Sequence, residues 1–481
     1  MTMLIEGVSR RKFLDGTGRV AAASVLSNVF PQLLRAEGLP KPGQADWTRF
    51  GYDLHNTRFN RNEKAIGPGN VGQLKMKWAF GTKDGWPIQS TPTVIGNTLF
   101  FGAGGYYYSL DSATGTLNWS FETGVGGEWL ANYLLPGTRS SAHYENGRIY
   151  FGTGLCNVHC LDAATGREIW KTAVEPRKEM MASMMFSPVV YRDNVIVGYS
   201  GSMTEVVCMH AETGAVRWRF RVVKDVPEKY QTGGASMWTS AAIDEQQNVV
   251  FNVTGNAKAY NGPTLYANSL IAHDVDTGEL LWAYQAHPQD IHDLDFCAHP
   301  MVFDAVAPQR SRGDVRRCVG AGNKANFVCL NRHTGELYWK VALNAPSASS
   351  GPLICATAVA YNRVYLQSAS PSSVPSLGVS AALNAYTGDI EWLVPNPGLQ
   401  ASPIAVANGV MYQGITNPAK LEALDANTGQ RLWEFAMPSA VRGGMTVANG
   451  ALYASNGETG AWQGEKTPYA HAVYCFTPEG R

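Results

Sequence analysis

The ten residues LDAATGREIW, Leu161–Trp170, are one of seven copies of a pattern that recurs along this chain with unchanged internal spacing. Every copy holds Thr-Gly in its middle and ends on a Trp four residues after the Gly. The others are LDSATGTLNW (110–119), MHAETGAVRW (209–218), HDVDTGELLW (273–282), LNRHTGELYW (330–339), LNAYTGDIEW (383–392) and LDANTGQRLW (424–433). A unit that recurs at intervals of roughly 40 to 65 residues indicates a series of similar supersecondary modules.

Each copy is typical of a β-hairpin. An alternating apolar run leads into the Thr-Gly turn, where the Gly supplies the positive φ that a tight turn needs, and a short strand follows. Further strand-like runs lie upstream, such as GRIYFGT (147–153) and NVIVGYS (194–200). Each repeat therefore predicts about four antiparallel strands, which is one blade of a β-propeller.

The two chain ends hold complementary halves of an eighth repeat. CFTPEGR begins at Cys475 and stops at the C-terminus without its Trp, whereas LKMKWAF, Leu74–Phe80, has a Trp and no preceding turn. We therefore predict an all-β fold, an eight-bladed β-propeller over residues 46–481 with Trp-containing repeats, whose last blade is closed by the N-terminal strand. Closure removes the exposed edges of an open array. The repeated Trp residues are expected to pack on neighbouring blades rather than to act in catalysis.

Composition excludes some classes of partner. Lys plus Arg and Asp plus Glu number 39 each, which makes the net charge zero, and no long basic run is present, so nucleic acid is not expected as a partner. No Cys-x-x-Cys-His sequence occurs, which argues against a covalently attached haem.

The eight Cys residues divide into two groups. Cys160, Cys208, Cys329 and Cys475 fall at one position of the repeat, where other copies carry Ala, and are predicted to be small buried hydrophobes. The pairing of the other four stays open from sequence alone; they are Cys156, Cys297, Cys318 and Cys355.

Residues 1–36 differ in character from the repeats. SRRKFL, Ser9–Leu14, places paired arginines before the apolar stretch VAAASVLSNVF (20–30), which resembles a twin-arginine export signal. The apolar run is too short for a membrane span, and the alternative is a basic surface helix. A periplasmic or secreted protein is expected, with no membrane span in the mature chain.

The repeats and the opening DWTRFGYDLHNTRFN (46–60) resemble the quinoprotein alcohol dehydrogenase superfamily, with the polyvinyl-alcohol-dehydrogenase-like branch most similar. The resemblance covers residues 46–481. It implies an eight-bladed propeller that holds pyrroloquinoline quinone (PQQ) and a metal ion, calcium or a lanthanide, on its axis. Because cofactor-free assembly factors use similar blades, the repeat is more specific for the fold than for the cofactor.

Three residues outside the repeats match the family's cofactor-binding positions. Trp238, in GGASMW, matches the indole that lies flat under the quinone. Lys324, in GNKANFVCLN, matches the cation that faces the quinone oxygens, and Arg139, in RSS, matches the arginine that holds a carboxylate. The alternatives are a structural Trp and two surface cations.

The acidic stretch HPQDIHDLDF (287–296) matches the family's catalytic segment. The resemblance makes Asp293 both the general base and a metal ligand, and makes Asp295 the added carboxylate of lanthanide-using members. Asn256, in TGNA, matches a metal-ligating Asn, and an amide oxygen suits a hard cation. The alternatives are an acidic surface loop and an ordinary turn.

Three departures from the family pattern concern the site. Met203 stands where the family has a metal-ligating Glu, so Glu205 is the candidate replacement. Gln89 stands near the position of a Glu that contacts the cofactor, and no adjacent Cys pair is present.

Taken together, these features predict an exported PQQ-dependent dehydrogenase that oxidises a small-molecule alcohol to a carbonyl. With no haem sequence, its electrons would pass to a separate acceptor such as a cytochrome c. One alternative is a cofactor-free propeller that acts as an interaction or assembly scaffold. Another is a mononuclear metal site that uses His292, His299 and nearby carboxylates.

Overall fold

The computed structural model divides the chain into two units, residues 1–37 and 38–481. It describes only parts of the second unit, and the fold below refers to those parts. The described residues are 42–83, 88–125, 137–177, 182–201, 203–222, 235–256, 264–288, 290, 294–308, 313–343, 356–368, 378–396, 402–457 and 471–480.

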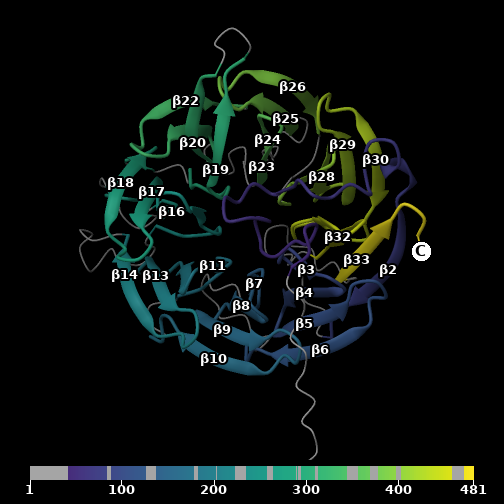
Figure 1. The fold of residues 1–481 in the computed structure, drawn as a ribbon, viewed down its shortest axis with the longest axis horizontal. Coiled ribbons are helices and arrows are strands. Elements are labelled where there is room, and N and C mark those ends of the chain that lie inside the picture. The colour runs from purple at the N-terminus through teal and green to yellow at the C-terminus, as the bar shows by residue number, and fades with distance from the viewer. Residues whose placement is uncertain are drawn as a thin grey trace, which may run out of the picture. The chain divides into compact units, whose positions relative to one another are not determined.

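Eight sheets, each built around four antiparallel strands, form the blades of a closed propeller (Figure 1). From the axis outward, the first four blades are β3 (Thr93–Ile95), β4 (Thr98–Ala103), β5 (Tyr106–Asp111), β6 (Leu117–Glu122); β7 (His143–Glu145), β8 (Arg148–Gly152), β9 (Asn157–Asp162), β10 (Glu168–Ala173); β11 (Val189–Tyr191), β12 (Asn194–Gly198), β13 (Glu205–His210), β14 (Val216–Arg221); and β15 (Ala242–Asp244), β16 (Val249–Val253), β17 (Ser269–Asp274), β18 (Leu280–Gln285).

The other four blades repeat this order. They are β19 (Met301–Val306), β20 (Val315–Gly322), β21 (Phe327–Asn331), β22 (Leu337–Val341); β23 (Ala356–Ala360), β24 (Arg363–Ser368), β25 (Val379–Asn384), β26 (Ile390–Pro395); β27 (Ala405–Ala407), β28 (Val410–Ile415), β29 (Lys420–Asp425), β30 (Arg431–Ala436); and β31 (Thr446–Ala448), β32 (Ala451–Ser455), β33 (Ala472–Thr477), β2 (Lys75–Gly81). Two short elements remain, β1 (Phe59–Asn60), parallel to β27, and the 3₁₀ turn η1 (Val71–Gln73).

The repeated turn connects the third and fourth strands of seven blades; in the eighth these strands are β33 and β2, which the chain does not connect directly. In the first copy, the Asp111 carboxylate accepts the Thr114 N–H at 2.8 Å, and Gly115 has a φ of +74°. A Cβ on Gly115 would lie 2.7 Å from the Trp78 ring of the preceding blade. The Gly is therefore required both by the turn and by the indole that packs on it.

The repeated Trp residues join each blade to the next, as the sequence predicted. Trp119 Nε1 donates to the Ala163 carbonyl at 3.1 Å, and Trp170 Nε1 donates to the Ala211 carbonyl at 2.9 Å. Equivalent bonds run from Trp78 to Ser112, Trp218 to Val275, Trp282 to Arg332, Trp339 to Ala385, Trp392 to Ala426 and Trp433 to Leu74. The indoles form a structural belt between blades.

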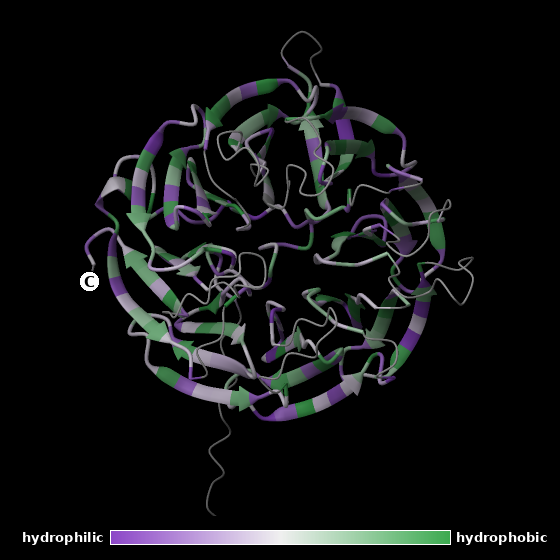
Figure 2. Cartoon of the chain, turned by 180° about the vertical axis from the view of Figure 1, so that it is seen from behind, coloured by the Kyte–Doolittle hydropathy of each residue, from purple (hydrophilic) through white to green (hydrophobic). Residues whose placement is uncertain are grey.

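The predicted closure of the ring is confirmed. Strand β2 pairs antiparallel with β33, with Lys75 opposite Thr477 and Ala79 opposite Tyr474. The N-terminal strand thus becomes the outermost strand of the last blade. The outer strands alternate hydrophilic and hydrophobic residues around the rim (Figure 2), because one face of each strand packs inward while the other meets water.

The cysteine prediction also agrees with the structure. Cys160, Cys208, Cys329 and Cys475 are buried with free thiols, each opposite a repeated Trp on the neighbouring strand. Of the other four, Cys156 and Cys318 are also buried with free thiols, Cys297 is partly exposed, and Cys355 lies outside the described residues.

The segment that precedes β2 crosses the middle of the ring, in purple in Figure 1. It meets the innermost strands of successive blades through backbone bonds. These join Trp47 to Val94, Thr48 to Tyr144, Leu54 to Ile243, His55 to Val302, Thr57 to Val359 and Arg58 to Val406. The segment, residues 47–60, therefore closes one end of the axis, and we call it the plug.

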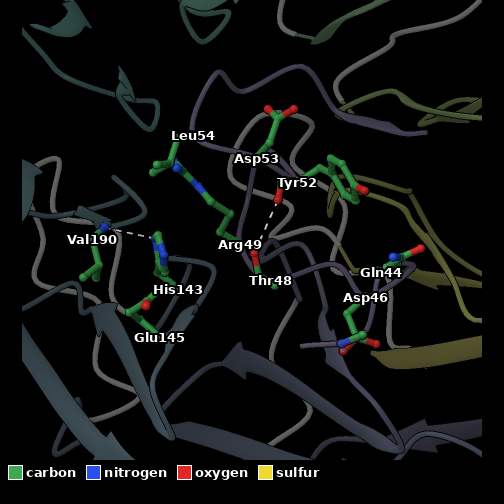
Figure 3. Close-up of a pocket in the computed structure, with 11 residues that line it drawn as sticks. Gln44, Asp46, Thr48, Arg49, Tyr52, Asp53, Leu54, His143, Glu145 and Val190 are labelled. Atoms are coloured by element: carbon green, nitrogen blue, oxygen red, sulfur yellow. Dashed lines mark hydrogen bonds between the residues drawn. The ribbon is translucent and has the colours of Figure 1, made fainter. Parts of the chain in front are cut away.

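Buried arginine holds the plug in place. The Arg58 guanidinium donates to the carbonyls of Phe50, Ile404 and Met445, and burial lowers its pKa to about 9. The plug, the residues just before it and the second and third blades line an open pocket of about 300 Å³ (Figure 3). Beside it, His143 Nδ1 accepts the Val190 N–H at 3.0 Å, which links these two blades.

Candidate functional site at the open end of the axis

Strand direction determines which loops share the end of the axis opposite the plug. Each innermost strand runs from this end toward the plug, so the hairpin between the second and third strands returns to it. The Thr-Gly turns lie at the plug end. The open end therefore collects two kinds of segment, those just before the innermost strands and those between the second and third strands.

Six partly exposed residues occupy equivalent positions at the open end. Each lies four residues before the first residue of an innermost strand, and the residue preceding each one is buried. We call this set the axial ring: Gln89, Arg139, Met185, Trp238, Cys297 and Arg442. Two of the three cofactor-binding candidates, Arg139 and Trp238, are thus brought onto one ring from different blades.

Short hydrogen bonds hold consecutive segments of the ring together. The Thr91 N–H donates to Ser141 Oγ at 2.8 Å, and the Ser141 N–H donates to Ser187 Oγ at 2.9 Å. Ser240 Oγ then donates to the Ser187 carbonyl at 2.8 Å. These bonds connect four blades next to the ring and position its side chains relative to one another.

Lys324, Asp295 and Asn256, three residues expected at the site, form one cluster. Lys324 Nζ lies 2.8 Å from Asp295 Oδ2, and the Asn256 N–H donates to Asp295 Oδ1 at 2.6 Å. Lys324 and Asn256 belong to corresponding hairpins of adjacent blades, β20–β21 and β16–β17. The pair is largely buried, with the Asp295 side chain 2% exposed, so the Lys324 charge compensates a carboxylate that burial alone would disfavour.

Gly255 and Asp290 support this cluster, and the sequence interpretation missed both roles. A Cβ on Gly255 would lie 2.1 Å from Asp295 Oδ1, so only Gly allows the carboxylate to approach. Asp290 Oδ2 accepts the Leu294 N–H at 2.6 Å and Asn268 Nδ2 at 2.9 Å, which fixes the chain just before Asp295. The Gly that precedes Asn256 in TGNA was the sequence feature that could have indicated the role of Gly255.

The cluster adjoins the axial ring. The Gly255 N–H donates to the Ser236 carbonyl at 2.7 Å, two residues before Trp238, and Asp295 lies two residues before the ring member Cys297. A cation, a buried carboxylate and an amide therefore lie between the fourth and fifth blades, next to the segment that carries Trp238.

Glu205, the proposed replacement metal ligand, has other partners in this structure. It lies at the start of β13, where Arg219 Nη1 contacts its Oε2 at 2.8 Å and Tyr199 OH donates to the same oxygen at 3.0 Å. This ion pair accounts for its low exposure without a metal. The assignment of Glu205 as a ligand remains a prediction.

The remaining candidates are placed as follows. Asp293, the expected base and ligand, and His292 lie outside the described residues. Met203 is described and partly exposed. His299 is buried against the plug, its ring edge-on to Phe50 at 5.2 Å, which gives it a packing role.

The described residues fit a quinone and a hard cation in part. Asn256 Oδ1 is buried and accepts no hydrogen bond from the described residues, so a neutral oxygen ligand is available beside the Asp295 carboxylate. In the part of the chain that the structure describes, no cluster of three or more His, Cys, Asp or Glu side chains forms a complete metal site. Asn256 and Asp295 would hold the metal with Asp293, while Trp238, Lys324 and Arg139 would contact the quinone.

Fold and sequence together define the class of this protein. A family model described as the β-propeller domain of glucose, ethanol and alcohol dehydrogenases, the PQQ family, matches residues 47–352, which is well over half of the chain. The chain therefore belongs to this family. A second model, described as the outer membrane protein assembly factor BamB, matches residues 307–398 and 376–466.

Individual relatives are distant in sequence and similar in fold. A quinohemoprotein alcohol dehydrogenase from Comamonas testosteroni is 26% identical over 356 residues, which cover 66% of this chain and 49% of that protein. A polyvinylalcohol dehydrogenase from Sphingopyxis is 24% identical over 453 residues, covering 81% of this chain and 66% of that protein. The chain thus spans about half the length of the first of these relatives.

A solved quinohemoprotein alcohol dehydrogenase from Pseudomonas putida superposes with a TM-score of 0.80 at 19% identity, covering 91% of this chain and 81% of that one. This likeness confirms the propeller fold. Separately, none of the described helices has the length and apolar character needed to cross a membrane.

Proposed function

We propose that this chain is a PQQ-dependent dehydrogenase that oxidises an alcohol to a carbonyl compound at the open end of its propeller. The observation that carries the proposal is the Lys324–Asp295–Asn256 cluster next to the segment that carries Trp238, with Arg139 at the equivalent position of another blade. A scaffold protein has no chemical reason to bury a lysine–carboxylate pair beside an axial indole. Relatives whose names denote quinone-dependent alcohol dehydrogenases support the same activity.

Each residue has a distinct part in the proposed reaction. Trp238 supplies a flat surface for a planar ring system, and Lys324 places a positive charge where negative charge develops. Asn256 and Asp295 provide oxygen ligands for calcium or a lanthanide, and the Asp293 carboxylate takes the hydroxyl proton of the alcohol. When bound, the quinone would accept the hydride that leaves the carbinol carbon of the alcohol. The electrons then leave to a separate acceptor, for which we propose a cytochrome c.

We further propose that the chain is exported, with residues 1–36 as the signal and residues 46–481 as the propeller domain. The paired arginines Arg10 and Arg11 support twin-arginine export to the periplasm or the medium. Changing both to Lys should retain the protein in the cytoplasm, as measured by cell fractionation. Normal secretion of that variant would exclude this route.

The decisive experiment is reconstitution. Purified protein is mixed with PQQ and either calcium or a lanthanide, and an absorption change at the quinone band is measured together with dye reduction by a panel of alcohols. We expect quinone binding that requires the metal, and turnover with at least one alcohol. If neither occurs, the second candidate function, an assembly scaffold as suggested by the BamB model match, takes precedence.

A further inference from the structure

The axial ring contains a second arginine, Arg442, that no family pattern led us to expect. It precedes β31 by four residues, as Arg139 precedes β7 and Trp238 precedes β15. Because the eight blades are pseudo-symmetric, residues at equivalent positions lie at similar depth and distance from the axis. Arg442 therefore belongs to the same level of the open end as the proposed cofactor-binding residues.

Contacts place Arg442 and Arg139 on either side of Gln89. A Cβ on Gly443, next to Arg442, would lie 3.1 Å from the Ile88 carbonyl, so the eighth blade contacts the segment of Gln89. On the other side, the Thr91 N–H is bonded to Ser141 Oγ, two residues after Arg139. The order around the axis is therefore Arg442, Gln89, Arg139.

The two guanidinium groups are close enough to influence each other. Burial, and then the positive charge of Arg442, lower the pKa of Arg139 to about 10. Arg139 Nη1 donates a hydrogen bond to a neutral atom, Met185 Sδ, at 3.6 Å. An anion that binds between two like charges in a partly desolvated site reduces their mutual repulsion.

The described ring members supply no negative charge of their own. They comprise two arginines, an amide, a thioether, an indole and a thiol. The adjacent carboxylate, Asp295, is bonded to Lys324. Arg139, Arg442 and Lys324 outnumber Asp295 among these described side chains, and Asp293, which the proposed function places at the same site, adds one further carboxylate. The two arginines make this part of the open end suited to a ligand that carries carboxylates.

We propose that Arg442 is a second carboxylate-binding residue, which forms with Arg139 a two-guanidinium clamp for a planar aromatic polycarboxylate stacked on Trp238. The inference rests on the proposed function insofar as the quinone, a tricarboxylate, is that ligand. Gln89, between the two arginines, is uncharged and does not neutralise them, so the ligand's carboxylates can do so. The planar guanidinium pairs with a carboxylate through two parallel bonds, which an ammonium cannot do.

Binding measurements on variants test the clamp without any assay of turnover. Dissociation constants for PQQ, for its trimethyl ester and for benzene-1,2,4-tricarboxylate are measured by calorimetry with wild type, Arg442→Gln, Arg442→Lys and Arg167→Gln. Arg167 is exposed on a Thr-Gly turn at the plug end, so its variant repeats the charge change away from the site. We expect Arg442→Gln to weaken PQQ and the tricarboxylate by roughly 10- to 100-fold, the effect of losing one charged hydrogen-bonded pair.

The pattern across ligands and variants identifies the clamp. Arg442→Lys should bind with intermediate affinity, the ester should bind Arg442→Gln and wild type equally, and Arg167→Gln should match wild type. Equal affinity of wild type and Arg442→Gln for PQQ would overturn the clamp and leave the proposed function intact. Wild type that binds the tricarboxylate but not PQQ, with loss in Arg442→Gln, would support the clamp and exclude the quinone. If wild type binds neither PQQ nor the tricarboxylate, both the clamp and the proposed function are overturned.

Discussion

Individual residues at the open end have separable roles, and the buried Asp295 shows why. Both of its oxygens are engaged, one by Lys324 Nζ and one by the Asn256 N–H. Each oxygen keeps a further lone pair that a metal ion could use, whereas a proton acceptor needs an oxygen that the substrate can reach. We therefore propose Asp293, two residues earlier in the chain, as the base.

Asp293→Asn tests that division of roles. The amide keeps the shape of the side chain but cannot accept the proton, so kcat should fall by roughly 10² to 10⁴ while quinone affinity stays within a few-fold of wild type. Steady-state kinetics and a quinone titration measure the two effects. Asp389→Asn, the same change on a Thr-Gly turn, is the control. A variant with wild-type kcat would show that another group takes the proton.

His299 gives a pH dependence to stability. Burial, and next the charge of Arg58, lower the pKa of His299 to about 3, against 6.5 for an accessible histidine. Between these values the unfolded chain binds a proton that the folded chain does not. The contribution of His299 to the free energy of unfolding should therefore be complete above pH 6.5. It should be lost as the pH falls toward 3, by up to about 1.4 kcal/mol per pH unit for one such group.

Urea unfolding between pH 7 and pH 4 measures this slope. His299→Gln should reduce the slope because the titrating group is gone. Phe50→Leu, which alters the ring packed on His299 but removes no titrating group, should lower stability at every pH and keep the slope. An unchanged slope in His299→Gln would mean that other buried groups, such as His143, dominate the acid sensitivity.

At the scale of elements, the hairpin with its turn and Trp is the unit that builds the ring. The turn glycine and the indole of the previous blade are in direct contact, so the repeat encodes a joint between blades as well as a hairpin. A comparison of Gly147 with Gly166 separates the two reasons for a glycine, which are the positive φ and the lack of space for a Cβ. Both have positive φ, at +79° and +71°, but a Cβ would meet nothing within 4 Å at Gly147 and the Trp119 ring at 2.6 Å at Gly166.

Alanine at each position measures the joint. Gly147→Ala should cost about 1 kcal/mol, the strain of a side chain at positive φ. Gly166→Ala adds displacement of the Trp119 indole and loss of its bond to Ala163, so a total of about 3 kcal/mol is expected. Chemical denaturation of both variants provides the comparison. Equal losses would mean that the indole moves aside freely and the joint contributes little.

At the scale of the whole molecule, stability depends on closure at two places. The β2–β33 pairing closes the ring at its rim, and the plug closes it at the axis by bonding to the innermost strands. Six of the eight innermost strands have only three residues, so they have few ladder bonds of their own; β19 and β23 are longer. The plug offers backbone partners where the sheets are narrowest.

Deletion of Leu74–Phe80 tests the rim closure. Without these residues β33 becomes an exposed edge and the first blade loses the Trp78 indole, so the single melting transition should broaden or fall sharply in temperature. Met76→Thr, at an exposed position of the same strand, should melt as wild type does. Differential scanning calorimetry measures the melting transition of each variant. Addition of a peptide spanning residues 71–81 should restore the transition of the deletion variant if lost strand pairing is the cause. A deletion variant that melts normally would exclude closure by this strand.

The sequence by itself determined the blades, the turn glycines, the Trp belt and the closing strand, because each depends on contacts that the repeat carries in a fixed local spacing. It also indicated Lys324, Asp295 and Asn256, which the structure brings together. Only the tertiary structure decided that Arg442 joins Arg139 on one ring, that Glu205 pairs with Arg219, and that residues 47–60 seal the axis. The arginine ring and the plug join residues hundreds of positions apart through the packing of eight sheets, which no local spacing encodes. The Glu205–Arg219 pair lies within one hairpin, 14 positions apart, but only the observed strand register brings the two side chains together.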